Sequence, residues 1–312
     1  MRTKIKEIAA SMYSDGYTSR LEMMGRSMEA KTIKQKEMLL SIIVGEFGDR
    51  NLDDIKIKEV MSFLFYIDRS NSWKNRCLTV ISEIYEEYNW SHKKQIPRPK
   101  FPRFINNSTK SDVFTEEELT AFFNSAYWSD MTCRLLFLLI AGCGLRLGEG
   151  RAVRKRQFQE NSLIVDGFIS STGRRTNYNK GGKNVSDGKI RVVPVPGRIL
   201  SEITDYLTLS DCPEDDYVFI RHGKPLSQRY TESVFQRTLK KSGINVNGRK
   251  LVPHSLRYTY VTLLRRTSPV DEVRRLVGHT SASMTEYYTR PGLSDLLQNA
   301  NNFKSTVDRI FG

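Results

Sequence analysis

Apolar residues in the first hundred positions recur every three or four residues, which is the spacing of one face of an α-helix. The pattern is clear in three segments and weaker over residues 8–24, and turn-forming residues at 49–54 and 68–72 separate the segments. It predicts a small, all-α unit of about four helices. The apolar positions are Leu39, Ile42, Ile43 and Phe47 in the first segment, Ile57, Val60, Phe63, Leu64 and Ile67 in the second, and Trp73, Cys77, Val80, Ile81 and Ile84 in the third.

The pattern changes after residue 104. Thr115 and Glu118 form a capping box that predicts a helix start, and an apolar run predicts a helix over 132–142. Residues 162–169, 175–180 and 190–195 have strand character around the turn-rich segment 181–188, which predicts an antiparallel sheet with one long hairpin. A short strand-like run follows at 217–220, and helical patterns return at 198–209, 228–242, 254–266, 270–277, 284–290 and 294–303.

These elements predict a mainly α fold with a small antiparallel sheet, an α+β class. They divide the chain into a helical domain at 1–104 and a mixed domain at 105–312.

The segment between the two patterns, residues 92–104, contains three prolines and five lysines and arginines. Proline cannot continue a helix, so we expect an extended linker. Its positive charge is typical of a segment that contacts DNA phosphates, although an ordinary solvated linker has the same composition. The residues expected to bind DNA are Lys93, Lys94, Arg98, Lys100 and Arg103.

The overall charge favours the DNA interpretation. The chain has 312 residues, a net charge of +14 and a pI near 9.6, which is the electrostatic character of a protein that binds a polyanion. Hydrophobic residues make up 39% of it, enough for ordinary cores. Basic charge alone is weak evidence, so the function depends on motifs.

Several classes of protein are disfavoured. The four cysteines, Cys77, Cys133, Cys143 and Cys212, are scattered, which argues against a zinc site or a disulfide framework. The longest apolar run, residues 135–145, is shorter than the ~20 residues of a membrane span, and no apolar run follows the N-terminus as in a secretory signal. We therefore expect a protein without a membrane span, in the cytoplasm with the nucleoid, or in a host cell's cytoplasm if viral.

Two motifs place arginines where they can bind an anion. In Gly144-Leu-Arg-Leu-Gly-Glu149, Arg146 follows an apolar helix, and a buried guanidinium there needs an anionic partner. Glu149 could be that partner, in which case the motif is only a buried ion pair. In His254-Ser-Leu-Arg257, the spacing of three predicts a cationic pair on one helix face, beside an apolar stripe.

A third motif, Leu276-Val-Gly-His279, is followed nine residues later by Tyr288. Ser283 and Glu286 form a second capping box, which predicts that Tyr288 lies on a short helix. Taken alone, a tyrosine at a helical position is more often a core aromatic. The three motifs in this order are much less easily explained as coincidence.

Together the motifs resemble those of the tyrosine recombinases of the phage integrase family. The family's Gly-Leu-Arg-x-x-Glu box matches residues 144–149, its His-x-Leu-Arg box matches 254–257, and its Leu-x-Gly-His box with the later tyrosine matches 276–288. The resemblance covers nearly the whole chain and implies a helical core-binding domain and a catalytic domain that clamp DNA.

The resemblance also implies the role of each residue. Tyr288 would be the nucleophile that forms a 3′-phosphotyrosyl link, with Tyr287 as the rival that the nine-residue spacing disfavours. Arg146 and Arg257 would bind the non-bridging phosphate oxygens, and His254 and His279 would assist by hydrogen bonding and proton transfer. The expected reaction needs no metal and no cofactor.

The family also uses a lysine in the hairpin as general acid. The long hairpin here offers Lys180, Lys183 and Lys189, of which Lys180 at the end of the expected strand is favoured; all three could instead be solvated lysines. Two positions depart from the family pattern. Tyr258 stands where many members have a second histidine, and Gly150 where an apolar residue is usual.

An apolar stripe on the expected helix 293–304 could pack within its own chain, but the resemblance suggests that it docks onto a neighbour in a DNA-bound tetramer. The expected partner is double-stranded DNA with short inverted repeats. Two alternatives remain open: a DNA-binding regulator with a vestigial site, and DNA relaxation of the type IB topoisomerase kind. The sequence also leaves open the target site, and whether the role is integration, transposition or resolution of chromosome dimers.

Overall fold

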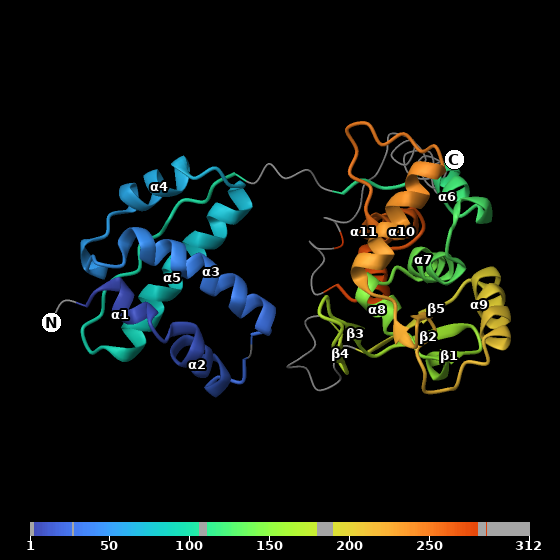
Figure 1. Cartoon of the computed structure of the whole chain (residues 1–312), viewed down its shortest axis with the longest axis horizontal. Coiled ribbons are helices and arrows are strands. Elements are labelled where there is room, and N and C mark those ends of the chain that lie inside the picture. Colours follow the sequence, from blue (N-terminus) through green and yellow to red (C-terminus); the bar gives the residue numbers. More distant parts are fainter. Residues whose placement is uncertain (1–2, 27, 106–110, 180–189, 280–284, 286–312) are drawn as a thin grey trace, which may run out of the picture. The chain divides into compact units, whose positions relative to one another are not determined.

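The computed structural model describes residues 3–26, 28–105, 111–179, 190–279 and 285. The chain forms two compact units, Met1–Thr109 and Lys110–Gly312 (Figure 1). Each unit has its own hydrophobic core, so each is described by itself.

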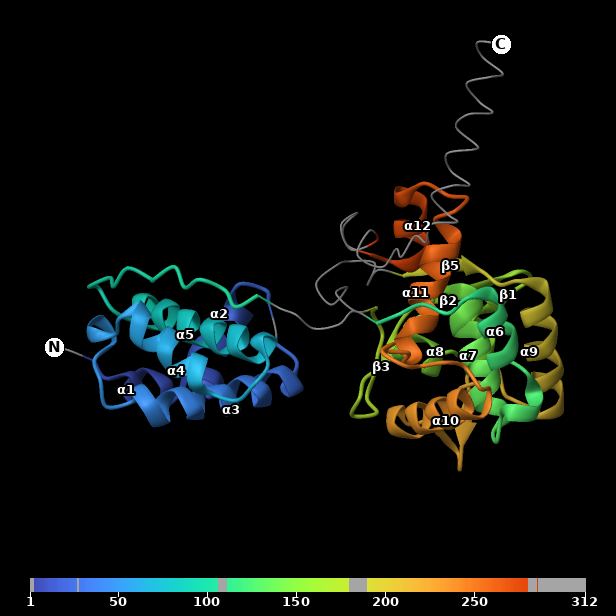
Figure 2. The same cartoon turned by 90° about the horizontal axis from the view of Figure 1, so that it is seen from above.

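The N-terminal unit is all α among its described residues, as the apolar periodicity predicts. Leu39, Ile43 and Phe47 are buried as expected, as are Val60 and Leu64, whereas Ile42 and Ile57 are exposed. The long last helix, α5, packs against α1 and α3 (Figures 1 and 2). The helices are α1 (Ile5–Ala9), a π-helical turn (Met12–Gly16), α2 (Tyr17–Met23), α3 (Ala30–Phe47), a 3₁₀ turn (Leu52–Asp54), α4 (Ile57–Tyr66) and α5 (Asn71–Ser91).

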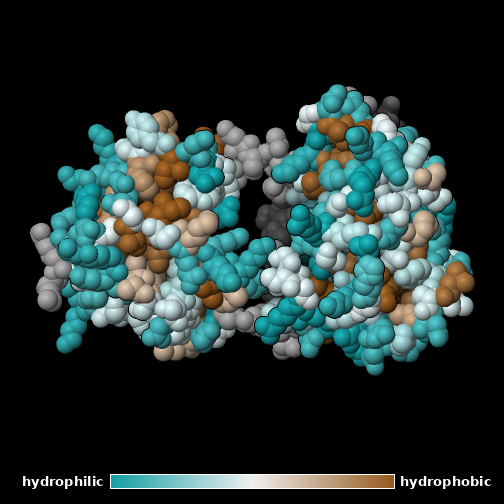
Figure 3. Space-filling view, viewed as in Figure 1, coloured by the Kyte–Doolittle hydropathy of each residue, from teal (hydrophilic) through white to brown (hydrophobic). Residues whose placement is uncertain are grey.

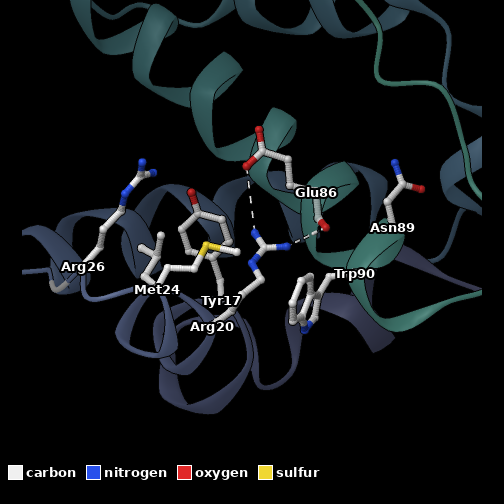
Figure 4. Close-up of a pocket in the computed structure, with 8 residues that line it drawn as sticks. Tyr17, Arg20, Met24, Arg26, Glu86, Asn89 and Trp90 are labelled. Carbon is white, nitrogen blue, oxygen red and sulfur yellow. Dashed lines mark hydrogen bonds and ion pairs between the residues drawn. The ribbon is translucent and has the colours of Figure 1, made fainter.

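Arg20 links α2 to α5 through a hydrogen bond and two cation–π contacts. Its Nη1 donates to the backbone oxygen of Glu86 at 2.8 Å, and its guanidinium lies over the rings of Tyr17 and Trp90, 4.8 and 5.5 Å from their centres (Figure 4). Cation–π contacts of this kind stabilise by roughly 0.5–2 kcal/mol. The buried arginine therefore has a structural role in this unit.

The proline-rich segment 92–104 is extended, as expected, but it is not a free linker. Two asparagines of α5 each bind one residue of the segment through both its backbone groups: Asn89 binds Ile96, at 2.8 and 2.9 Å, and Asn75 binds Phe104, at 2.9 and 2.8 Å. The side chains of Ile96 and Phe104 also pack against the core of the unit. Composition could not show this attachment, because it depends on amides supplied by a distant helix.

Both arginines expected to bind DNA are already engaged with α5. Arg98 pairs with Glu86 at 2.5 Å, and Arg103 donates to the backbone oxygen of Asn75 at 2.6 Å and to Thr79 at 3.1 Å. Lys93, Lys94 and Lys100 are exposed.

The C-terminal unit is built around α7, whose apolar run is buried. This helix spans Met131–Cys143, one residue longer at each end than expected, and packs against α8, α9 and α11 (Figures 1 and 2). The capping box of Thr115 and Glu118 is confirmed, with both hydrogen bonds formed at 3.2 and 2.9 Å. The helices are α6 (Glu116–Phe122), α7, α8 (Leu147–Arg151), α9 (Gly197–Leu209), α10 (Gln228–Lys241), α11 (Pro253–Leu264) and α12 (Val270–Val277).

The antiparallel sheet is confirmed, but its strands are shorter than predicted. The expected strand over 162–169 breaks at Asp166 and Gly167, where a side chain on Gly167 would collide with the backbone of Thr176. Three strands pair in the order β1-β2-β5, with Leu163 opposite Val193 and Val165 opposite Arg191. The strands are β1 (Phe158–Gln159), β2 (Ser162–Val165), β5 (Arg191–Pro194), and the separate pairs β3 (Phe168–Ile169) with β4 (Arg175–Thr176) and β6 (Ile220–Arg221) with β7 (Lys224–Pro225).

Hydrophilic side chains cover most of the face in Figure 3, with scattered hydrophobic patches on both units. Among the described residues, no helix is both long and apolar enough to cross a membrane.

Gly144 provides a test of the turn that ends α7. It has φ +61°, and a Cβ there would collide with the ring of Tyr260; Gly243 ends α10 with φ +69° and open space around it. Gly243→Ala should cost ~1 kcal/mol for the left-handed backbone alone, and Gly144→Ala a further ~1–3 kcal/mol for overpacking. Thermal unfolding measures both variants. Equal shifts in melting temperature would show that Tyr260 does not restrict this turn.

Candidate active site

Arg146 and Glu149 are positioned by the sharp turn between α7 and α8. The left-handed Gly144 ends α7, and Arg146 then occupies the N-cap position of α8. Glu149 accepts a hydrogen bond from the backbone nitrogen of Arg146 at 2.9 Å and one from its Nη1 at 2.8 Å. Gly150 lets α8 lie close to α7, because a Cβ would be only 2.9 Å from Leu136. The departure from the family pattern at residue 150 is thus explained by packing.

The carboxylate of Glu149 lies at the centre of the cluster. Its side chain is fully buried, and Arg191 and Arg257 approach it in addition to Arg146, at 2.8 and 4.0 Å. Burial alone would raise the pKa of this carboxyl, but the guanidinium charges, led by Arg191, outweigh burial and hold the pKa far below its usual range. Three guanidiniums and one carboxylate leave the cluster with two net positive charges, so it attracts an anion.

Two backbone oxygens fix the guanidinium of Arg257 beside this cluster. Its Nη1 donates to the backbone oxygen of Gly144 at 2.5 Å and its Nη2 to that of Val277 at 2.6 Å. The residue is completely buried, so it does not form the surface cationic pair with His254 that the helical spacing predicts. The reason is that α11 packs against α7, which turns the arginine face of α11 inward.

His279 follows α12 through a left-handed turn at Gly278, whose φ is +67°. Its Nδ1 lies 3.0 Å from Oγ1 of Thr285, and the residue is 7% exposed. Burial, and then the charges of Arg257 and Arg146, lower its pKa to about 3. The imidazole is therefore neutral at physiological pH.

His254 is the second residue of α11 and is half-buried. Its ring meets that of Tyr258 edge to face, with centroids 5.1 Å apart. Tyr258, the other departure from the family pattern, is 6% exposed, and its ring packs against that of His254. His254 is also among the groups that lower the pKa of His279.

The structure thus brings Arg146 and Arg257 together at Glu149, and the charges of these arginines and of His254 act on His279. The remaining expected site residues lie outside the described residues: Lys180, Lys183, Lys189, Tyr287, Tyr288, the capping pair Ser283 and Glu286, and the helix expected at 293–304. Within the described residues, no group of three His, Cys, Asp or Glu side chains could hold a metal ion.

Sequence reasoning missed Arg191. It opens β5 opposite Val165 and shares the inward face of the strand with the buried Val193. An arginine in phase with buried strand residues is a signal that it has an anionic partner, but the sequence does not identify that partner as Glu149.

Residues 112–293 match the phage integrase family. The chain belongs to this family. It is a tyrosine recombinase, an enzyme that cleaves and rejoins DNA. The match spans Arg146, His254, Arg257, His279 and Tyr288.

The tyrosine recombinase is similar to XerA proteins of archaea. It is 28% identical over 222 residues to XerA of Pyrococcus furiosus, covering 69% of this chain and 68% of the relative. It is 26% identical to XerA of Pyrococcus horikoshii, with 98% of both chains covered.

Solved structures show the same fold. The Tn1549 transposon integrase in complex with transposon right-end DNA has a TM-score of 0.75 at 14% identity, covering 99% of this chain and 100% of that one. A lambda integrase tetramer bound to a Holliday junction has a TM-score of 0.68 at 18% identity, covering 93% and 78%.

The low pKa of His279 predicts its behaviour on acidification. An unfolded histidine binds a proton near pH 6.5, whereas His279 in the folded chain stays neutral to about pH 3. The fold therefore loses stability as the pH falls below 6.5, by about 1.4 kcal/mol at pH 5.5. NMR of ¹³C-labelled histidine rings, assigned with His279→Gln, should show no titration of His279 between pH 8 and 5. A midpoint near pH 6.5 would contradict the buried, cation-flanked site.

Proposed function

We propose that the cluster around Glu149 is the phosphate-binding part of the recombinase active site, and that Tyr288 attacks DNA there to form a 3′-phosphotyrosyl intermediate. The observation that carries the proposal is the net positive cluster of Arg146 and Arg257 beside the neutral His279. Arginine's planar donors match the non-bridging oxygens of a phosphodiester, and fixed donors stabilise the charge that develops in the transition state.

In the proposed step, the Oη of Tyr288 forms a bond to phosphorus and the bond to the 5′-oxygen breaks. The tyrosine proton must leave and the 5′-oxygen must receive one, because tyrosine's usual pKa is near 10. We assign the first transfer, acceptance of the tyrosine proton, to the histidines His254 and His279, and the second, protonation of the 5′-oxygen, to Lys180, in preference to Lys183 and Lys189. His254 and His279 assist by hydrogen bonding, and the neutral imidazole of His279 has both a donor and an acceptor nitrogen. Side chains alone carry this chemistry.

The guanidiniums differ in accessibility, which divides their proposed roles. The side chain of Arg146 is 17% exposed, against 8% for Arg191 and none for Arg257. Arg146 is therefore the arginine best placed for direct contact with phosphate. Arg257, fixed by two backbone oxygens, supplies a preorganised charge.

We further propose that residues 1–104 form the core-binding domain, that residues 105–312 form the catalytic domain, and that the partner is double-stranded DNA with short inverted repeats. Lys93, Lys94 and Lys100 are exposed and available to DNA phosphates, while Arg98 and Arg103 would have to exchange contacts with α5. Phosphate contacts add affinity but no direct sequence information.

We propose that the recombinase assembles as a tetramer on DNA through the segment 293–304, as the apolar stripe there suggests, and acts in the cytoplasm. Lambda integrase has been seen as a tetramer on a Holliday junction, which supports this assembly. The likeness to both XerA proteins and a transposon integrase leaves chromosome-dimer resolution, integration and transposition as candidate roles.

A suicide substrate with a nick near the cleavage position tests the proposed nucleophile. Wild-type protein should form a covalent protein–DNA adduct, visible as a shifted band on a denaturing gel. Tyr288→Phe should form none, because it lacks the attacking oxygen, whereas Tyr287→Phe is the matched control and should still form it.

The adduct assay, combined with gel-shift and plasmid-relaxation assays, separates the alternatives. Specific DNA binding without any adduct would favour a regulator with a vestigial site. Relaxation of supercoiled DNA without strand exchange would favour the topoisomerase-like activity.

Truncation after Gly292 tests the proposed assembly. The shortened protein should still bind a single DNA site but form fewer synaptic complexes and recombinants, because the helix that links neighbours is lost. Gel-shift and recombination assays measure both effects. Full recombination by the truncated protein would show that this segment packs only within its own chain.

A further inference from the structure

Arg191 has every guanidinium nitrogen engaged at the active-site cluster. Its Nη2 and Nη1 donate to the two oxygens of Glu149, at 2.8 and 3.3 Å, and its Nε donates to the backbone oxygen of Leu276 at 3.0 Å. It is the first residue of β5, so it ties the sheet to α8 and to the end of α12.

Arg191 and Arg146 share Glu149 unequally. Side-chain nitrogens of Arg191 contact both carboxylate oxygens, whereas the side chain of Arg146 contacts one. A fully buried carboxylate must be neutralised by its neighbours. Because Arg191 supplies much of that neutralisation, the charge of the more exposed Arg146 remains available for an anion.

Arg191 also supports the turn that precedes His279. A Cβ on Gly278 would lie 3.2 Å from Nη1 of Arg191 and 3.4 Å from its Cδ, so the backbone of the turn rests directly on this side chain. The hydrogen bond to Leu276 fixes the same turn from its other end. The position of His279 therefore depends on Arg191 as well as on Thr285.

We propose that Arg191 is a positioning residue for DNA cleavage. By binding Glu149 and the carbonyl of Leu276 together, it holds Arg146 and the Gly278–His279 turn where the scissile phosphate binds. Arg191 acts through these groups and does not itself contact the phosphate. The inference rests on the proposed function of the cluster.

Single-turnover adduct formation on the nicked substrate tests this role with Arg191→Lys and Arg191→Met. Lysine keeps the charge but cannot reach both carboxylate oxygens and Leu276 together. Both variants should form the adduct more slowly, on the order of 100-fold, as expected for a small misplacement of reacting groups. The Kd for the DNA site should change less than about threefold, since most phosphate contacts lie elsewhere.

Arg134 is the matched control. It is a similarly buried arginine of the same unit and likewise binds one carboxylate, Glu202 at 2.5 Å, and one backbone oxygen, that of Phe123 at 3.0 Å. Arg134→Met should therefore lose stability through the same kinds of broken contact but leave the cleavage rate near that of wild type. Equal slowing by Arg134→Met and Arg191→Met would mean that general destabilisation explains the effect, and would overturn the proposal.

A double variant asks whether Arg191 acts through Glu149. In Arg191→Met alone, the carboxylate has lost its two-oxygen partner and competes with DNA for Arg146; adding Glu149→Gln removes that negative charge. The double variant should therefore cleave no more slowly than Arg191→Met, a non-additive result. Losses that multiply would show that the two residues act independently, contrary to the proposal.

The His279 ring gives a readout that needs no DNA. The charge of Arg191 is one of those that lower the His279 pKa, so this pKa should rise in Arg191→Met and much less in Arg134→Met. An unchanged titration, or unchanged cleavage by both Arg191 variants, would overturn the inference. Absence of any adduct with wild-type protein would instead contradict the proposed function, and the titration would still test the position of Arg191.

Discussion

The buried carboxylate of Glu149 is the constraint on which the proposed active site depends. A single negative charge without solvent would be too costly to keep, so the fold surrounds it with arginines from three separate segments. The three arginines carry more positive charge than one carboxylate neutralises. In the proposed function, the site is thereby prepared for a phosphodiester before DNA binds, which is what electrostatic preorganisation requires.

Backbone oxygens near Glu149 also bind the guanidiniums. Those of Gly144, Leu276 and Val277 each accept a hydrogen bond from an arginine, and two of these residues lie at the end of α12. Oxygens at a helix end carry partial negative charge, so they favour cations. The same contacts fix the turn that leads to His279.

Much of the fold and part of the proposed site could be predicted from the sequence, wherever a feature depends on residues that are close together in the chain. The helical periodicity, the Thr115 capping box and the motifs containing Arg146 and Arg257 depend on residues close together in the chain. Arg191 was missed because its role depends on strand register and on Glu149, 42 residues away. The burial of Arg257 and the attachment of segment 92–104 likewise depend on packing between distant elements.

The side-chain amides of Asn75 and Asn89 shorten the part of the chain that connects the two units. Because they bind the extended segment as far as Phe104 onto the first unit, the chain left to connect the units is only the few residues that follow. The backbone nitrogen of Asp112 donates to the backbone oxygen of Lys250 in the second unit, which leaves the seven residues 105–111 between the two attachments, and seven residues can span at most ~25 Å. If the two units bind DNA as proposed, a connection of at most this length keeps the second unit at a local concentration on the order of millimolar once the first has bound. The second binding event is then effectively intramolecular, so modest contacts by each unit add up to firm attachment.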